Sequence, residues 1–260
     1  MMHRAKKSLG QNFLKSQSAL EKIAEAGELS PADTVLEIGP GLGALTERLL
    51  ERAGKVIAVE KDRELFAMLS EKFAPQITAN KLLLLEGDIL DFDPAKYPET
   101  AEKYKIVANI PYNITGAILK KFLTAEKQPN RMVLLVQKEV ADRIMARDGK
   151  ESILSISVKA YGAPKIEGKI PAGSFSPAPK VDSAIIIIGN ISRKFFTEKK
   201  IGEEAFWRLI RLSFAHKRKK LAGNLRGKDS DFPLIPKEFR DKRAEDLSLS
   251  DWTRFFHQKS

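Results

Sequence analysis

A glycine-rich loop that directly follows a short apolar strand constrains the fold of this chain more than any other stretch. Residues 34–38, Thr-Val-Leu-Glu-Ile, have the apolar character of a buried strand, and Gly39-Pro40-Gly41-Leu42-Gly43 follows at once. Helical spacing begins at Ala44. A strand, a tight glycine turn and a helix in this order are typical of an α/β sheet whose turn approaches a ligand closely.

The alternation of strands and helices continues to about residue 145. We expect strands at residues 55–60, 82–86, 105–109 and 132–136, and helices across residues 18–27, 44–52, 61–73, 118–123 and 138–145. This spacing predicts a parallel, doubly wound, Rossmann-like α/β sheet. Two more strands are expected at residues 165–170 and 182–188, whereas residues 152–161 fit either a strand or a helix.

The character of the sequence changes after Asn190. Before it, the proline-rich residues 171–179 are expected to lack regular structure and to line a cleft. After it, residues 191–200 are polar and basic and are interpreted as a linker, and helical patterns follow from Glu203. We therefore predict an α/β domain over residues 1–190 and a small all-helical domain over residues 191–260.

A carboxylate completes the pattern that begins at the glycine loop. Glu60 ends the second strand, where an acidic residue binds the hydroxyls of a ribose. Together with Gly39 and Gly41 it predicts a nucleoside-containing cofactor. The pattern does not separate NAD from S-adenosylmethionine, and a plain strand-to-helix turn with a capping acid is the simpler alternative.

Two later features favour S-adenosylmethionine. Asp88 follows the third strand, where its carboxylate could accept a hydrogen bond from an adenine amine, although Gly-Asp is also common in turns. Asn109 and Ile110 can offer two more acceptors to a planar amine, the first from its side chain and the second from its backbone. Pro111 restricts that backbone, and Tyr112 offers a stacking ring. Alone, these four residues fit a strand-to-turn exit equally well.

The composition excludes several functional classes. The chain has no cysteine, which rules out disulfides, cysteine-bound zinc and thiolate nucleophiles, and its three histidines are scattered. The formal net charge of +11 favours a polyanionic partner such as nucleic acid. A basic run suits phosphate contacts, although a solvated helix face is the alternative; it contains Lys217, Arg218, Lys219 and Lys220.

Six short motifs occur in order along the chain: Gly10-Gln11-Asn12-Phe13-Leu14, Leu36-Glu37-Ile38-Gly39-Pro40-Gly41, Glu86-Gly87-Asp88, Asn109-Ile110-Pro111-Tyr112-Asn113-Ile114, Val136-Gln137-Lys138-Glu139-Val140-Ala141, and Phe175-x-Pro177-x-Pro179-Lys180-Val181-Asp182-Ser183, where x is any residue. Their order closely resembles the small-subunit ribosomal RNA adenine dimethyltransferases, the KsgA family. The resemblance is strong over residues 6–190 and looser beyond.

The resemblance implies S-adenosylmethionine as methyl donor. It also implies transfer of two methyl groups to each of two adjacent adenines in the 3′-terminal hairpin of small-subunit ribosomal RNA. The resemblance implies that Gln11, Asn12 and Leu14 close over the cofactor, that Gly39 approaches its methionine part and that Gly41 also binds it. Glu60 would bind the ribose and Asp88 the cofactor's adenine. Asn109 would contact both cofactor and target base, and Tyr112 and Phe175 would stack on the flipped adenine.

One departure and two alternatives accompany the resemblance. Residues Glu151-Ser152-Ile153 stand where the family usually carries Tyr-Gly, which leaves the geometry near the cleft open. One alternative is a large-subunit methyltransferase of the macrolide-resistance type, because those enzymes share Gln-Asn-Phe and Asn-Ile-Pro-Tyr. The other is an assembly factor that binds pre-ribosomal RNA without catalysis. We expect a cytoplasmic monomer without a metal or a membrane span, acting on small-subunit RNA in the pre-30S particle.

Overall fold

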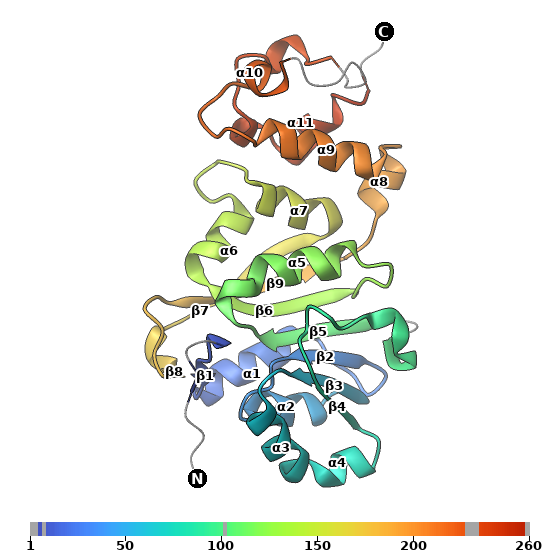
Figure 1. The fold of residues 1–260 in the computed structure, drawn as a ribbon, viewed down its shortest axis with the longest axis vertical. Coiled ribbons are helices and arrows are strands. Elements are labelled where there is room, and N and C mark those ends of the chain that lie inside the picture. Colours follow the sequence, from blue (N-terminus) through green and yellow to red (C-terminus); the bar gives the residue numbers. More distant parts are fainter. Residues whose placement is uncertain (1–4, 7–8, 101–102, 227–233, 258–260) are drawn as a thin grey trace. The chain divides into compact units, whose positions relative to one another are not determined.

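The computed structural model describes residues 5–6, 9–100, 103–226 and 234–257 (Figure 1). The chain forms two compact units. The sheet unit comprises Met1–Ala141 and Ala163–Ile191, and the helical unit comprises Asp142–Gly162 and Ser192–Ser260. Residues 142–162 thus group with the C-terminal residues, whereas the predicted domain boundary at residue 190 stays a prediction.

A seven-stranded mixed sheet organises the described part of the sheet unit (Figure 1). Five strands run parallel, β9 pairs antiparallel with β6, and β7 pairs antiparallel with β9. The predicted Rossmann-like sheet is confirmed, and an antiparallel edge extends it. Across the sheet the order is β4 (Leu82–Glu86), β3 (Lys55–Glu60), β2 (Thr34–Ile38), β5 (Tyr104–Asn109), β6 (Arg131–Gln137), β9 (Ser183–Gly189) and β7 (Ala163–Ile170).

Helices in the connections cover the sheet, and the longer ones do so with an apolar face. In α1, for example, Leu20, Ile23 and Ala24 are buried at helical spacing, and the Ser16 side chain caps the first turn. The connecting helices are α1 (Gln17–Ala26), α2 (Ala44–Leu50), α3 (Arg63–Lys72), α4 (Ala74–Thr78), α5 (Thr115–Thr124) and α6 (Lys138–Met145).

The central strands are mostly apolar because helices bury both faces of the sheet. Four of the five residues of β2 and five of the six of β3 are buried. Parallel strands end at the same edge of a sheet, so the polar residues that close β2, β3 and β5 are brought together there. This edge positions the site described below.

The proline-rich segment contains regular structure, contrary to expectation. Ala172–Ser174 forms a 3-10 turn, and β8 (Phe175–Ser176) pairs antiparallel with β1 (Phe13–Leu14) (Figure 1). Proline removes a backbone donor only at its own position, so the two residues before Pro177 remain free to pair with a distant segment. The prediction of an irregular segment is therefore wrong for these residues.

The helical unit is built from short helices around aromatic side chains. Phe196, Phe206 and Trp207 form edge-to-face or tilted ring pairs with one another. The ambiguous residues 152–161 are helical, and the predicted linker includes one helix. The helices of this unit are α7 (Ile153–Tyr161), α8 (Lys194–Glu198), α9 (Glu203–Ser213), α10 (Leu221–Leu225) and α11 (Leu249–Thr253).

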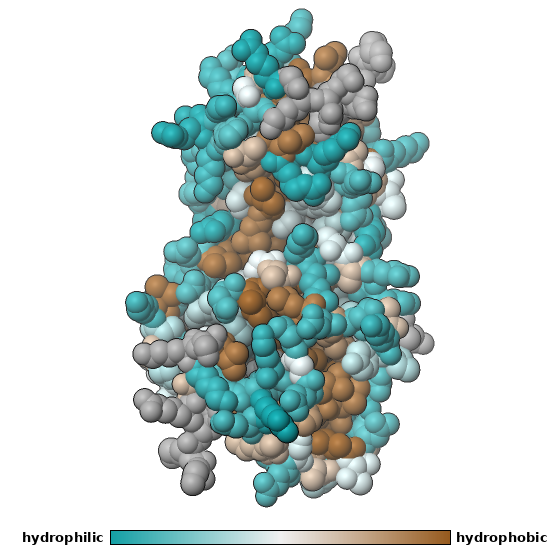
Figure 2. All heavy atoms as spheres, viewed as in Figure 1, coloured by the Kyte–Doolittle hydropathy of each residue, from teal (hydrophilic) through white to brown (hydrophobic). Residues whose placement is uncertain are grey.

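The visible surface is mostly hydrophilic, with hydrophobic residues in scattered groups (Figure 2). Large hydrophobic side chains that are exposed include Leu42, Ile153 and Val181. Among the described helices, none combines the length and the hydropathy needed to cross a membrane.

Candidate active site

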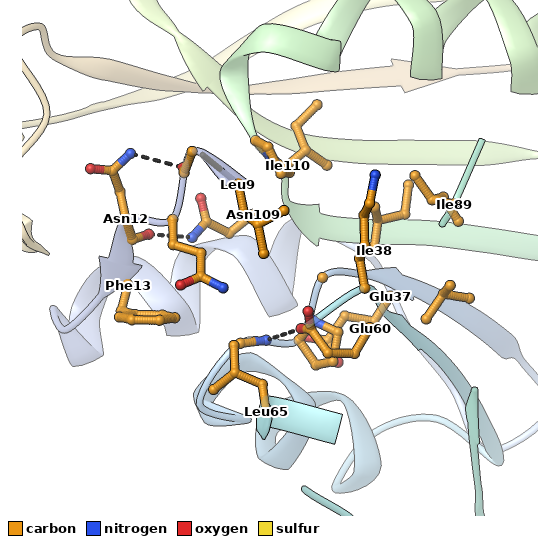
Figure 3. A pocket seen from close by; sticks show the side chains of 18 of the residues that line it. Leu9, Asn12, Phe13, Glu37, Ile38, Glu60, Leu65, Ile89, Asn109 and Ile110 are labelled. Carbon is orange, nitrogen blue, oxygen red and sulfur yellow. Dashed lines mark hydrogen bonds between the residues drawn. The ribbon is translucent and has the colours of Figure 1, made fainter. Parts of the chain in front are cut away.

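A pocket opens at the edge where the central strands end (Figure 3). The residues that line it come from segments far apart in the sequence, chiefly residues 9–14, 37–42, 59–61, 87–89 and 109–114. Most of the predicted site residues are thereby brought together. Those that line the pocket are Gln11, Asn12, Leu14, Gly39, Gly41, Glu60, Asp88, Asn109, Ile110, Pro111 and Tyr112.

The glycine loop takes a conformation that other residues rarely adopt. Gly39, Gly41 and Gly43 have φ angles of +64°, +61° and +80°. A Cβ at Gly43 would come within 2.6 Å of the Phe73 ring, whereas a Cβ at Gly39 would meet nothing within 4 Å. The loop is therefore packed on one side and open at Gly39, where a ligand can approach the backbone.

Glu60 lies in the pocket with both carboxylate oxygens engaged by backbone donors. The Gly41 N–H donates to Oε2 over 3.1 Å, and the Asp62 N–H donates to Oε1 over 2.8 Å. Burial raises the pKa of Glu60 above its usual value, although these two hydrogen bonds oppose the shift. Each oxygen keeps a further lone pair, so the side chain is held as an acceptor for a ligand's hydroxyls.

Glu37 is a pocket residue to which the sequence analysis assigned no role. It is 1% exposed, and its Oε2 has no hydrogen-bond partner among the described residues. Burial raises the pKa of Glu37 to about 8; the nearby Thr46 hydroxyl opposes the shift, although its geometry falls short of a hydrogen bond. An orphaned buried acid in a pocket fits a ligand that brings a positive charge. Its place before Gly39 was the only signal in the sequence.

Asp88 lines the pocket just after the end of β4. Lys61 Nζ donates to its Oδ2 over 2.7 Å, and the Leu90 N–H donates to Oδ1 over 2.9 Å. These two hydrogen bonds, the Lys61 bond first, lower the pKa of Asp88. The carboxylate therefore remains an acceptor at neutral pH, as its predicted role requires. It also forms an ion pair with Lys61, which was not among the predicted site residues.

Asn109 faces the N-terminal segment across the pocket (Figure 3). Its Nδ2 donates to the Asn12 carbonyl over 3.2 Å. This bond uses the donor end of the amide, so Oδ1 is the end that can accept from an amine. Asn12 is itself held by a bond of 3.1 Å from its Nδ2 to the Gly10 carbonyl.

The residues after Asn109 form a turn that fixes the tyrosine. Pro111 is extended, with ψ at 129°, and Tyr112 begins a 3-10 turn. The Tyr112 hydroxyl lies 2.6 Å from the Ser183 Oγ, and Ser183 is fully buried at the start of β9. Burial raises the pKa of Tyr112, so the phenol stays neutral. Ser183 was noted only as the end of a motif, and this contact explains its presence.

A strap formed by Leu9–Leu14, called here the N-terminal strap, lines one side of the pocket. Gln11 is tied to the loop after β3 because its Nε2 donates to Asp62 Oδ2 over 2.9 Å. Lys6 Nζ donates to Asp62 Oδ1 over 2.8 Å. No local sequence signal links Lys6 and Asp62 to this site, because these contacts span more than fifty residues of sequence.

Phe175 is not among the residues that line the pocket. It is 3% exposed in β8 and belongs to the buried core cluster, paired in register with Leu14. Its ring has no open face for a base in this structure. Its role as a second stacking surface stays a prediction.

The predicted RNA-binding run and the departure from the family pattern both lie in the helical unit. Lys217, Arg218, Lys219 and Lys220 are exposed in the turn between α9 and α10, and Lys220 pairs with Asp241 at 2.7 Å. At the departure, Ser152 forms a capping box with Ser155 at the start of α7. Glu151-Ser152-Ile153 thus opens a helix, and none of the three lines the pocket.

Comparisons with known proteins agree on one class of enzyme. The family model described as ribosomal RNA adenine dimethylase matches residues 2–257. Ribosomal RNA small subunit methyltransferase A of Dehalococcoides mccartyi (strain CBDB1) is 43% identical, with 96% of this chain and 87% of that protein aligned.

Two solved structures share the fold over nearly the whole chain. A dimethyladenosine transferase from Plasmodium falciparum has a TM-score of 0.78 at 27% identity, and the match covers 94% of this chain and 95% of that one. The 23S rRNA methyltransferase ErmE has a TM-score of 0.73 at 26% identity, with 94% and 98% covered.

Proposed function

The chain belongs to the ribosomal RNA adenine dimethylase family, and from this premise we propose that it dimethylates two adjacent adenines in the 3′-terminal hairpin of small-subunit ribosomal RNA, with S-adenosylmethionine as donor. The observation that carries the proposal is the convergence of Asn109, Glu60 and Asp88 in one pocket. The names of the relatives support small-subunit ribosomal RNA as the substrate, and we propose the pre-30S particle as the partner and the cytoplasm as the site of action.

The pocket fits S-adenosylmethionine in charge and in hydrogen bonding. Glu37 offers an unpartnered carboxyl oxygen to a cationic part, and open space at Gly39 admits the methionine part. Glu60 would accept from the ribose hydroxyls, and Asp88 from the adenine amine. The cofactor supplies a methyl group activated by a positively charged sulfur.

The target adenine's amine needs acceptors because its lone pair is delocalised into the ring. As the nitrogen becomes pyramidal it turns nucleophilic, and its hydrogens then require partners. Asn109 Oδ1 and the Ile110 carbonyl would accept them; the bond from Asn109 Nδ2 to the Asn12 carbonyl supports this role, because it leaves Oδ1 as the accepting end of the amide. Fixed acceptors at the point of charge development lower the barrier without reorganisation. The methylated amine is acidic, so a proton can pass to water.

The target base must leave its stack, which costs on the order of a few kcal/mol. The Tyr112 ring offers a stacking surface that offsets part of this cost, and the Ser183 hydroxyl anchors that ring. Basic side chains of the helical unit would hold the RNA backbone, with Lys217, Arg218 and Lys219 as the candidates.

A direct test is methyl transfer from labelled S-adenosylmethionine to under-methylated ribosomal subunits. We expect label in small subunits and a dimethyladenosine product. Label that enters only large subunits would contradict the proposed substrate and support the activity named for ErmE. Binding of RNA without any transfer would support a non-catalytic assembly factor instead.

A further inference from the structure

Asp62 lies behind the pocket and not among the residues that line it. It is 2% exposed, and its side chain caps the first turn of α3 by accepting the Glu64 N–H over 3.1 Å. A capping role alone would leave the carboxylate open to water. The burial of this carboxylate therefore has another cause, which is the chain that covers it.

The side chain of Asp62 joins α3 to the N-terminal strap and the residues before it. Gln11 and Lys6 donate to separate oxygens of the carboxylate, over 2.9 and 2.8 Å. Gln11 is also held from its other end, because its Oε1 accepts the Lys6 N–H over 2.7 Å. The orientation of the Gln11 amide in the pocket wall therefore depends on Asp62.

The backbone of Asp62 contacts a second part of the pocket wall. Its N–H donates to Glu60 Oε1, the carboxylate predicted to bind the ribose. One residue thus contacts both a strap residue and a cofactor acid, through different groups. Moving Asp62 would disturb both parts of the wall together.

We infer that Asp62 is a positioning residue for S-adenosylmethionine, which holds Gln11 over the pocket and Glu60 within it. The inference rests on the proposed function, because it takes the pocket to be the cofactor site. It goes beyond that function by assigning cofactor affinity to a residue outside the pocket wall.

The chemistry requires a carboxylate at this position. Gln11, Lys6 and the Glu64 N–H are all donors, and an asparagine would turn an amide N–H₂ toward one of them. Burial acts to raise the pKa of Asp62, but the hydrogen bonds from Lys6 and Gln11 outweigh it and lower that pKa. The side chain is thus a charged acceptor at neutral pH, and charge-assisted hydrogen bonds are the stronger kind.

The test is the isosteric variant Asp62→Asn in the full-length protein, titrated calorimetrically with S-adenosylmethionine. We expect the dissociation constant to rise by about tenfold, a typical effect of losing a charge-assisted hydrogen bond. In steady-state methyl transfer the KM for S-adenosylmethionine should rise while kcat changes little.

Asp33→Asn is the matched control. The side chain of Asp33, like that of Asp62, accepts hydrogen bonds in its described contacts. The donors are the Ser30 N–H, the Ser30 hydroxyl and Lys105, and, against the opposing effect of burial, these bonds lower the pKa of Asp33. It does not line the pocket. We expect Asp33→Asn to leave cofactor binding unchanged.

Gln11→Met keeps the inference testable even if Asp62→Asn does not fold. It should raise the dissociation constant, and the double variant should bind no worse than Asp62→Asn alone. Unchanged affinity in Gln11→Met, or in a folded Asp62→Asn, would overturn the inference. Absence of binding by the wild-type protein would instead contradict the proposed function.

Discussion

At the scale of single residues, each polar group of the pocket is held by a partner that determines which atom is left for a ligand. Asn109 uses its Nδ2 on Asn12 and keeps Oδ1, and Glu60 receives two backbone N–H groups. Glu37 differs because its Oε2 has no hydrogen-bond partner in the part of the chain that the structure describes. The site therefore contains one buried carboxyl group, that of Glu37, whose hydrogen bonding is incomplete, and the protonation state of this group can be tested.

Replacing Glu37 by glutamine should change how stability depends on pH. The pKa of Glu37 is about 8 in the folded protein, compared with about 4.3 in an unfolded chain. The proton on this group therefore stabilises the fold fully below about pH 4, and that contribution is lost as the pH rises toward 8. Glu37→Gln should gain stability over wild type between pH 5 and 8, by up to about 1.4 kcal/mol per pH unit.

The measurement is urea unfolding of both cofactor-free proteins at several pH values. Glutamine cannot ionise but keeps the shape of the side chain, so the difference between the two proteins isolates this group. A difference that stays constant from pH 5 to 8 would show that Glu37 is not protonated in the folded protein.

The tyrosine anchor gives a second prediction at this scale. Tyr112→Phe keeps the ring but loses the bond to Ser183, and Ser183→Ala loses the same bond from the other side. Each should lower kcat/KM for RNA by about tenfold, because a small misplacement of the stacking ring misaligns the amine. The double variant should be no worse than either single one. Losses that simply add would show that the bond does not position the ring.

At the scale of elements, the pattern of apolar residues predicted the strands of the sheet well. It did not predict the pairing between short segments that lie far apart in the sequence. Residues 82–86 form a strand with the predicted bounds, which four consecutive leucines before Glu86 indicated. β1 and β8 have two residues each, and nothing local distinguishes them from loops. Likewise, the partner of Tyr112 lies 71 residues away. The pocket residues that follow strands could be predicted, and the residues that hold them could not.

The glycine loop carries a prediction for stability. Gly43→Ala would combine a left-handed backbone with a Cβ at 2.6 Å from the Phe73 ring. We expect a loss of about 1–3 kcal/mol in the free energy of unfolding, measured with urea. Gly116→Ala is the contrast, because it lies in α5 with open space around it, and it should gain up to about 1 kcal/mol. Equal effects would mean that the turn geometry at Gly43 is not required.

At the scale of the whole molecule, the positive charge predicts a polyanionic partner, and the helical unit supplies the candidate contacts. The net charge is +11, and the run from Lys217 to Lys219 is exposed. Charge and exposure indicate that the partner is a polyanion, but they do not specify which part of it the protein contacts. Family membership then narrows the partner to ribosomal RNA.

A triple variant with glutamine in place of Lys217, Arg218 and Lys219 should bind RNA more weakly, and its binding should depend less on salt concentration. Three lost phosphate contacts should reduce the slope of log affinity against log salt by about 2. The control changes Lys194, Lys199 and Lys200, which are also exposed in the helical unit, and removes the same charge. Filter binding at several salt concentrations measures both slopes. An equal reduction in the two variants would assign the effect to net charge alone.

The central claim is that Asn109 Oδ1 accepts from the amine of a small-subunit adenine during methyl transfer. The most direct measurement is the dimethyladenosine content of small-subunit RNA, by mass analysis of nucleosides, after incubation with wild-type protein or Asn109→Ala. We predict dimethyladenosine with wild type and a loss of at least about a hundredfold in rate with the variant, which should still bind RNA. Dimethylation by Asn109→Ala at a rate near wild type would contradict the claim.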